Sequence, residues 1–237
     1  MKYALYLILL LAVASCTTSS PISQTAPRYQ TYNQYDQEPI TASLFEDETA
    51  TISEENIQKI LDGDYALPKE LRVALVKLEG TQSQTRYYWN DETYLKSQQA
   101  YLDSFTSQFK QSDRVQRISK IPDLLLSDKK TFTNIREAAV RTQSDIVVVY
   151  TIYSDLYAKY KLFAKSDIKA FATTQLMILD VRTGLIPFTT VVTREYQSKR
   201  KESELSNEEA ANRIKKEAIL LTIQEIGKRV NDFLETA

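Results

Sequence analysis

Histidine is absent from this 237-residue chain, and cysteine occurs only once, at Cys16. Histidine is the usual general base near neutral pH and the commonest metal ligand in proteins. Its absence excludes Ser-His-Asp and Cys-His catalysis, and it makes zinc and most other transition-metal sites hard to build. A single cysteine also excludes a disulfide within the chain. Carboxylate-only chemistry, such as glycoside hydrolysis, stays compatible with the composition.

Glycine is scarce as well, and its few residues are scattered along the chain, so no glycine-rich phosphate-binding loop is present. The formal net charge is -1, without the basic excess that nucleic-acid binding requires. Hydrophobic residues make up 43% of the chain and charged residues 26%, which is ordinary for a globular domain. We therefore expect a domain held by core packing, with no cofactor, no metal and no nucleic acid.

The first fifteen residues show the three-part pattern of a secretory signal peptide. Lys2 supplies a positive charge, Tyr3 to Leu11 form an apolar run, and small residues follow as far as Ser15. The run is too short to cross a bilayer, which takes about 20 apolar residues. Directly behind it, the stretch Val13-Ala14-Ser15-Cys16 resembles the lipobox of bacterial lipoproteins.

This resemblance implies a removed signal peptide, residues 1–15, and a lipidated Cys16. In lipoproteins of that type the cysteine sulfur takes a diacylglycerol, and the new amino terminus is usually acylated as well. Two or more acyl chains hold a protein stably on a membrane, whereas one binds marginally. Because Thr17 rather than aspartate follows, the resemblance implies the periplasmic face of the outer membrane. The alternative is an ordinary signal peptide with a chance cysteine.

Residues 16–50 carry the composition of a disordered tether. They are rich in Ser, Thr, Gln and Tyr, contain few aliphatic residues and show no period that could bury a face. Thirty such residues have a root-mean-square reach of roughly 30 Å. Tyr29, Tyr32 and Tyr35 recur at a spacing of three, which a helical stripe or a binding motif would also explain. We favour the interpretation that these tyrosines belong to a linker of biased composition.

Residues 51–237 show the patterns of a single α/β domain. Runs with helical periodicity alternate with β-branched apolar runs, and Gly184 between the last two β-rich runs predicts a hairpin. Crossover helices imply parallel neighbours, so we expect a mixed sheet with helices packed on it and a closing antiparallel meander. Capping boxes at Thr51–Glu54 and Ser206–Glu209 predict the starts of two helices, and two further helices are expected over 94–109 and 132–141. Strands are expected over 71–78, 114–121, 145–153 with a continuation to 163, 168–180 and 186–196.

The expected helices have apolar stripes that we assign to the core. The stripes consist of Ile57, Ile60 and Leu61 in the first helix; Leu95, Leu102, Phe105 and Phe109 in the second; and Ile214, Ala218, Leu221, Ile223, Ile226, Val230 and Phe233 in the last.

Three stretches carry a resemblance to a known group of envelope proteins: LRVALVKL at 71–78, SDIVVVYTI at 144–152 and LMILDVRTGLI at 176–186. The group contains the amino-terminal domain of TolB, the curli secretion channel lipoprotein and the outer-membrane lipoprotein that activates penicillin-binding proteins. Its members share an Ala-Asp-hydrophobic strand start and a Leu-x-Asp-x-x-Thr-Gly turn. The resemblance covers about residues 70–235 and implies a fold, while Tyr150 and Thr151 stand where members often have glycine.

The first functional hypothesis is a lipid-anchored interaction or adaptor protein that binds an envelope protein, without enzymatic activity. Tyrosine and tryptophan are favoured at interfaces because they bury a large area and keep a polar group. Ordinary half-buried tyrosines are the alternative, and the oligomeric state, including a homo-oligomer, stays open. The candidate contact residues are Tyr87, Tyr88, Trp89, Tyr153, Tyr157 and Tyr160.

Two further hypotheses are weaker. A subunit of an outer-membrane secretion or pore-forming assembly of the curli type needs two long amphipathic hairpins. Only 153–163 is long enough, and Lys159 and Lys161 fall on one face with Asp155. A carboxylate-based cell-wall hydrolase needs two facing acids in a cleft. The acids at predicted element ends are Asp62, Asp64, Asp123 and Asp180. A hairpin explains Asp180 better, and a helix stop explains Asp62 and Asp64 better.

Overall fold

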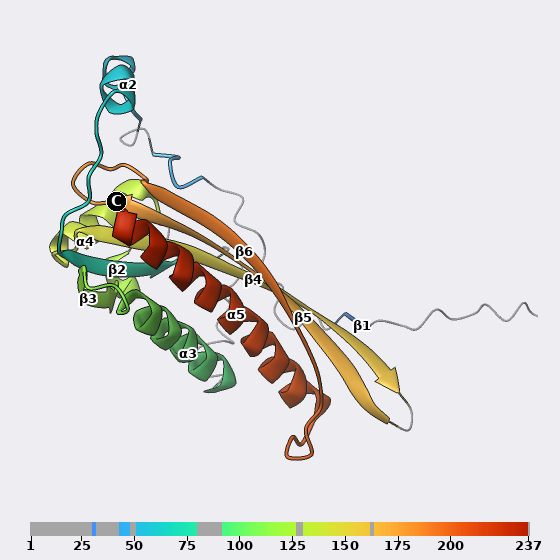
Figure 1. Ribbon diagram of the computed structural model, residues 1–237. Coiled ribbons are helices and arrows are strands. Elements are labelled where there is room, and N and C mark those ends of the chain that lie inside the picture. Colours follow the sequence, from blue (N-terminus) through green and yellow to red (C-terminus); the bar gives the residue numbers. More distant parts are fainter. Residues whose placement is uncertain are drawn as a thin grey trace, which may run out of the picture.

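The computed structural model describes residues 30–31, 43–47, 51–79, 92–126, 130–161 and 164–236. They form a mixed β-sheet with α-helices packed on it (Figure 1). The elements are β1 (Gln30–Thr31), α2 (Glu54–Leu61), β2 (Leu71–Lys77), α3 (Glu92–Phe109), β3 (Val115–Lys120), the short 3-10 helix η4 (Asp123–Leu125), α4 (Phe132–Arg141), β4 (Ile146–Lys161), β5 (Ala164–Asp180), β6 (Phe188–Lys199) and α5 (Asn207–Thr236).

The strand order is β3-β2-β4-β5-β6, with β1 paired to β4. Strand β2 is parallel to both β3 and β4, and α3 and α4 are the crossovers that these pairings need. Strands β4, β5 and β6 form an antiparallel meander. The expected α/β fold with a mixed sheet is therefore confirmed.

The meander is much longer than the parallel part of the sheet. The register of β2 against β4 ends at Lys77 and Tyr150, but β4 continues to Lys161. Over this extension β4 pairs with β5 on one side and with β1 at Tyr157 and Ala158 on the other. The predicted continuation of this strand is confirmed, and Figure 1 shows the β4–β5 hairpin reaching well past β2.

One face of the sheet is buried under α3 and α5. The 30-residue α5 packs along β5 and β6, and its residues Ile214, Ile223 and Ile226 are fully buried. Helix α3 packs beside α5, and the close approach falls at Gly227. A Cβ atom added there would lie 2.4 Å from the Cβ atom of Gln108, so a larger residue cannot fit without displacing α3.

Helix α4 covers the other face over β2, the start of β4 and the end of β5. Its buried residue Ile135 belongs to a second core cluster with Ala74 and Val147. The segment 43–47 adds to this cluster, because the Phe45 ring lies 5.0 Å from that of Phe132, whose backbone N–H donates to the Leu44 carbonyl. Two described pieces of the predicted tether, 30–31 and 43–47, thus contact the domain; the tether as a whole stays a prediction.

The three stretches that carry the resemblance meet at one end of the sheet. The buried Asp145 carboxylate accepts hydrogen bonds from Arg72 Nε and Nη2 at 2.9 Å and from Arg182 Nη2 at 2.7 Å. Asp180 Oδ1 accepts the backbone N–H groups of Arg182 and Thr183, and Gly184 adopts φ 77°. Both aspartates therefore hold the fold, and the expected hairpin role of Asp180 is confirmed.

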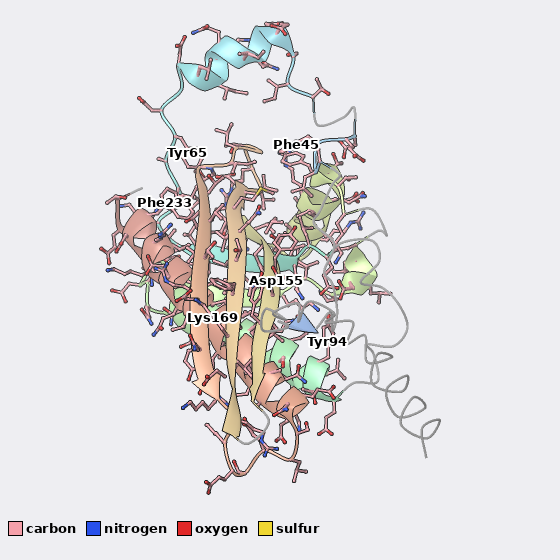
Figure 2. The ribbon with its side chains drawn as sticks, turned by 90° about the vertical axis from the view of Figure 1, so that its right-hand side faces the viewer. Phe45, Tyr65, Tyr94, Asp155, Lys169 and Phe233 are labelled. Carbon is pink, nitrogen blue, oxygen red and sulfur yellow. The ribbon has the colours of Figure 1, made fainter. Side chains whose placement is uncertain are left out.

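The first predicted helix differs from its expectation in two ways. Helix α2 begins at Glu54 with Ser53 as N-cap and no side-chain capping bond, so the box assigned to Thr51 is wrong by two residues. None of the eight residues of α2 is buried, and its apolar stripe, including the 73% exposed Leu61, does not reach the core. The reason is visible in Figures 1 and 2, where α2 lies apart from the sheet.

The other helices need smaller corrections. In α3 the buried Tyr101 belongs to the core, whereas the predicted core residue Leu95 is 44% exposed. In α5 Leu221 lies on the face turned away from β5. The second capping box is confirmed, since the Glu209 N–H donates to Ser206 Oγ at 3.1 Å.

Candidate functional site

Beyond the end of α4, one face of the meander is not covered by any described helix. Successive side chains of a strand point to opposite faces, so the even-numbered residues of β5 are buried under α5 and the odd-numbered ones point outward. Figure 2 shows this face toward the viewer, with Asp155 and Lys169 on it. We call it the open face and define it by Thr151, Tyr153, Asp155, Tyr157, Lys169, Phe171, Thr173, Gln175, Met177, Thr189, Val191, Thr193 and Glu195.

Aromatic, charged and threonine side chains contact one another across the open face. The Tyr157 ring meets the Phe171 ring edge-on at 5.6 Å between centroids, and Lys169 Nζ lies 4.6 Å from the centre of the Phe171 ring. Lys169 also pairs with Glu195 at 2.5 Å. Tyr157 remains 39% exposed and Val191 58% exposed. Exposed aromatic and aliphatic groups beside fixed charges are typical of protein-binding surfaces.

A groove of about 520 Å³ lies where the open face meets Leu44 of the segment 43–47 and Leu78 after β2. Thr151 stands out in it, because this residue is only 9% exposed and its hydroxyl has no hydrogen-bond partner among the described residues. A buried polar group without a partner is uncommon in a folded protein. The groove is lined by Leu44, Leu78, Val149, Tyr150, Thr151, Tyr153, Gln175, Leu176, Met177, Thr189, Thr190 and Val191.

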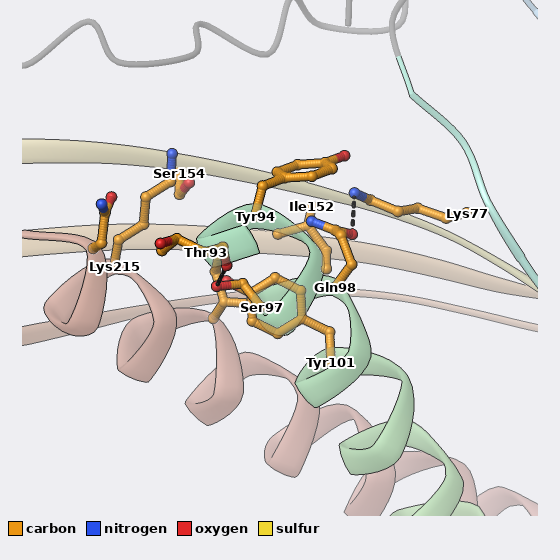
Figure 3. A pocket seen from close by; sticks show the side chains of 11 residues that line it. Lys77, Thr93, Tyr94, Ser97, Gln98, Tyr101, Ile152, Ser154 and Lys215 are labelled. Atoms are coloured by element: carbon orange, nitrogen blue, oxygen red, sulfur yellow. Dashed lines mark hydrogen bonds between the residues drawn. The ribbon is translucent and has the colours of Figure 1, made fainter. Parts of the chain in front are cut away.

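A second, much smaller cavity of about 70 Å³ lies between α3, α5 and β4 (Figure 3). At its rim Lys77 Nζ donates to Glu79 Oε1 at 2.6 Å and to Gln98 Oε1 at 2.8 Å, and the Tyr94 hydroxyl donates to Glu79 at 3.1 Å. Burial lowers the pKa of Lys77. Burial acts to raise the pKa of Glu79, but the charge of Lys77 and its hydrogen bond lower it. The pair is well satisfied, and the cavity has room for little more than water.

The structure brings two of the predicted contact residues together. Tyr153 and Tyr157 lie on the same strand and both belong to the open face. Sequence reasoning missed their neighbours on β5 and β6, above all Phe171 and Val191. The alternation of the stretch KAFATTQLM could have revealed them, because it places Phe171 on the face opposite the small, buried alanines. The other predicted site residues, Cys16, Tyr87, Tyr88 and Trp89, and the side chain of Tyr160, lie outside the described residues.

Besides Asp180, two of the acids considered for hydrolysis have structural roles. Asp123 pairs with Lys120 and Lys130, both at 3.2 Å, and Asp62 forms the C-cap of α2. Within the described ranges, no group of three or more His, Cys, Asp or Glu side chains is placed to hold a metal ion. Among the same residues, no helix has both the length and the apolar character for crossing a membrane.

No protein-family model and no curated protein matches the sequence. Among solved structures, the chain is similar to the hypothetical protein CT253 of Chlamydia trachomatis, with 12% identity and a TM-score of 0.42 over 71% of this chain and 99% of that one. It is also similar to lipoprotein GNA1162 of Neisseria meningitidis, with 11% identity and a TM-score of 0.33 over 56% and 88%. A minor lipoprotein of Acinetobacter baumannii matches with 8% identity and a TM-score of 0.31 over 72% and 94%.

Proposed function

We propose that the chain is a lipid-anchored adaptor of the bacterial cell envelope that binds another envelope protein through the open face. The observation that carries this proposal is the uncovered face of the meander, with Tyr157 and Val191 exposed on it. The exposed apolar and aromatic groups on this face gain free energy when a partner removes them from water, at about 25 cal/mol for each Å² of apolar area. We include in this proposal that the role of the chain resembles that of the lipoprotein that activates penicillin-binding proteins.

The charges of the open face favour a protein over a membrane as its partner. Lys169 is engaged by Glu195, and Asp155 is exposed, so the face has no excess of positive charge to attract anionic lipid headgroups. Membrane attachment is assigned instead to Cys16, behind the apolar run of the signal peptide. The proposed location is the periplasmic face of the outer membrane.

The anchor is tested by Cys16→Ala. We expect the variant to leave the membrane fraction and to lack the mass of the lipid, with Thr17→Ala as the matched control that stays attached. Retention of Cys16→Ala on membranes at the level of the control would contradict the anchor.

The binding surface is tested by capturing partners from cross-linked envelopes. We expect Tyr157→Ser and Val191→Ser each to lower the recovery of specific partners at least tenfold. Leu124→Ser is the matched control, because Leu124 is 93% exposed but lies in η4, away from the open face. Equal recovery with all three variants would remove the open face as the binding surface.

The structure offers less support for the two other hypotheses. The long β4–β5 hairpin, which the secretion or pore hypothesis needs, already packs the apolar side of β5 against α5 through Ile168, Ala170 and Ala172. Asp123 and Asp180, considered for hydrolysis, are held in ion pairs or in a turn. We therefore assign the chain a binding role and no catalytic one.

A further inference from the structure

We propose that the loop between β6 and α5 rests on the anionic lipid headgroups of the membrane that holds the protein. We call residues 199–206 the basic loop, because they begin with Lys199, Arg200 and Lys201. This inference rests on the proposed function, since the membrane is the one that a lipidated Cys16 would reach. It adds a second membrane contact, which the folded domain itself makes.

The basic loop lies at the end of the sheet where the chain arrives from its proposed anchor. Gln30 of β1 stands opposite Ala158 of β4, and Ala158 stands opposite Ile168 of β5. Ile168 in turn stands opposite Ser198 of β6, which directly precedes the basic loop. Three strand spacings of about 4.8 Å therefore separate Gln30 from Ser198, which amounts to about 14 Å.

The predicted tether is short enough to distinguish the two ends of the sheet. Fourteen residues lead from Cys16 to Gln30, and a flexible chain of that length has a mean span of about 20 Å. Asp180, at the opposite end of β5, lies about 40 Å from Ile168. Figure 1 shows the loop after β6 near the free end of the β4–β5 hairpin and α2 at the other end of the molecule. At its mean span, the tether would bring the end with the basic loop to the bilayer.

The basic loop carries an excess of positive charge on exposed residues. Lys199 and Lys201 are exposed, and within the described ranges neither they nor Arg200 form an ion pair. The loop contains two acids, but Glu204 is only 7% exposed and is held in an ion pair with α5. Glu202 is therefore the one exposed acid of the loop beside three cations. This excess is attracted to an anionic lipid surface.

Hydrogen bonds fix the basic loop and leave Leu205 in solvent. The Lys201 N–H donates to Glu204 Oε2 at 2.6 Å, and Arg213 Nη2 donates to the Lys199 carbonyl at 3.0 Å. Leu205 is 93% exposed. An exposed aliphatic side chain beside basic ones is suited to the headgroup region, where it enters the acyl boundary while the cations meet phosphates. Because the loop is already ordered, binding costs little further conformational entropy.

The acids that follow the loop have a role within α5. Glu208 and Glu209 lie in its first turn, where their charges meet the positive end of the helix dipole. Glu209 Oε2 also accepts the Leu205 N–H at 2.8 Å. An acidic protein is the other partner that a basic loop attracts. The short tether and the exposed Leu205 favour lipid, and the test separates the two.

The test measures how close position 205 lies to lipid in the anchored, full-length chain. Once Cys16 carries its lipid, Leu205→Cys supplies the one free thiol, to which bimane is attached. The chain is placed in nanodiscs of phosphatidylethanolamine and phosphatidylglycerol that contain brominated lipid. We expect bromine to quench bimane several-fold more at position 205 than in Leu61→Cys. Leu61 is the matched control, because it is 73% exposed but lies in α2.

Removal of charge tests the recognition of headgroups. The double variant Lys199→Gln with Lys201→Gln should lose the extra quenching at position 205. The unaltered loop should lose it in about 0.5 M salt and in nanodiscs of phosphatidylcholine alone. Lys110→Gln with Lys228→Gln is the matched control, since it removes the same charge from exposed residues near the C-terminal ends of α3 and α5. It should leave the quenching unchanged.

Equal quenching at the two positions of the anchored chain would overturn the proposal, and so would quenching at position 205 that survives the loss of both lysines. An acidic protein would cover the loop instead if position 205 is not quenched in pure lipid but is shielded from a water-soluble maleimide in whole envelopes. A chain that does not join the nanodiscs would contradict the anchor and this inference together. An anchored chain whose loop is not quenched contradicts this inference alone.

Discussion

Arg72 lies on β2 and Asp145 directly precedes β4, the neighbouring strand, and the Arg72 guanidinium donates to both carboxylate oxygens of Asp145 at 2.9 Å. The Arg72 N–H adds a third hydrogen bond at 3.0 Å. These bonds, with the one from Arg182, lower the pKa of Asp145 well below its ordinary value, although burial acts to raise it. The aspartate of the Asp-hydrophobic strand start at 145–146 thus links the parallel strands β2 and β4 by hydrogen bonds.

Asp145→Asn should therefore lower the free energy of unfolding by about 2–4 kcal/mol at neutral pH. The folded-state pKa lies below the unfolded value of about 3.9, so the stabilisation is present above that value and is lost as the pH falls below it. The variant should show a shallower acid limb between about pH 4 and pH 2 in denaturant titrations. A variant that is as stable as the wild type at pH 7 would contradict the role of this ion pair.

The fold was largely predictable because its signals are local. β-Branched runs such as DIVVVYTIY mark buried strands, and a positive φ at Gly184 requires the residue that the sequence has there. Errors arose where tertiary contacts decide. The stripe of α2 is as amphipathic as that of a buried helix, but no neighbour covers it. Tyr101 rather than Leu95 is buried because of where α3 crosses the sheet, which no local pattern encodes.

The candidate site could be predicted only in part for the same reason. Tyr153 and Tyr157 were identifiable from the composition of one strand. Their cross-strand neighbours depend on the register of β4 against β5, which sets Asp155 opposite Phe171. The groove depends on the docking of residue Leu44, 107 positions before Thr151, and a contact over that separation has no signature in a single sequence.

The contact of Gly227 with Gln108 predicts a strong size limit in α5. Gly227→Ala should lower the free energy of unfolding by about 1–3 kcal/mol, since the new methyl group would overlap the Gln108 side chain near its base. Glycine elsewhere in a helix is less stable than alanine by roughly 1 kcal/mol, so the sign of this change is diagnostic. Thermal and urea unfolding would measure it, with the exposed Lys228→Ala as a control expected within about 0.5 kcal/mol of wild type. A stabilised Gly227→Ala would contradict the close packing.

Two buried threonines offer a matched comparison. Thr151 has no hydrogen-bond partner among the described residues, whereas the Thr174 hydroxyl lies 2.6 Å from that of Thr222. Thr151→Val should raise the free energy of unfolding by about 1 kcal/mol, and Thr174→Val should lower it by about 1–2 kcal/mol. Equilibrium urea unfolding of both variants would measure the difference. Equal destabilisation would show that the Thr151 hydroxyl has a partner after all.

The buried pair of Lys77 and Glu79 predicts an asymmetry between its two members. Glu79→Gln would leave the buried Lys77 ammonium without its counter-charge and should cost about 3 kcal/mol or more. Lys77→Met removes the buried cation itself and should be milder, because Glu79 is more exposed and keeps its bond from Tyr94. Unfolding free energies at pH 7 would show the order. The reverse order would mean that Lys77 does not need the charge of Glu79.

The attachment of β1 to the far part of β4 limits how far the domain can stray from its proposed anchor. Counted to Gln30 rather than to the start of α2, the predicted tether behind Cys16 has fourteen residues. A flexible chain of that length has a mean span of about 20 Å and a fully stretched span of about 50 Å. With the proposed anchor, the strand end beside Tyr157 would lie within that distance of the bilayer. In its proposed location, the protein would therefore bind only those partners that come within this distance of the outer membrane.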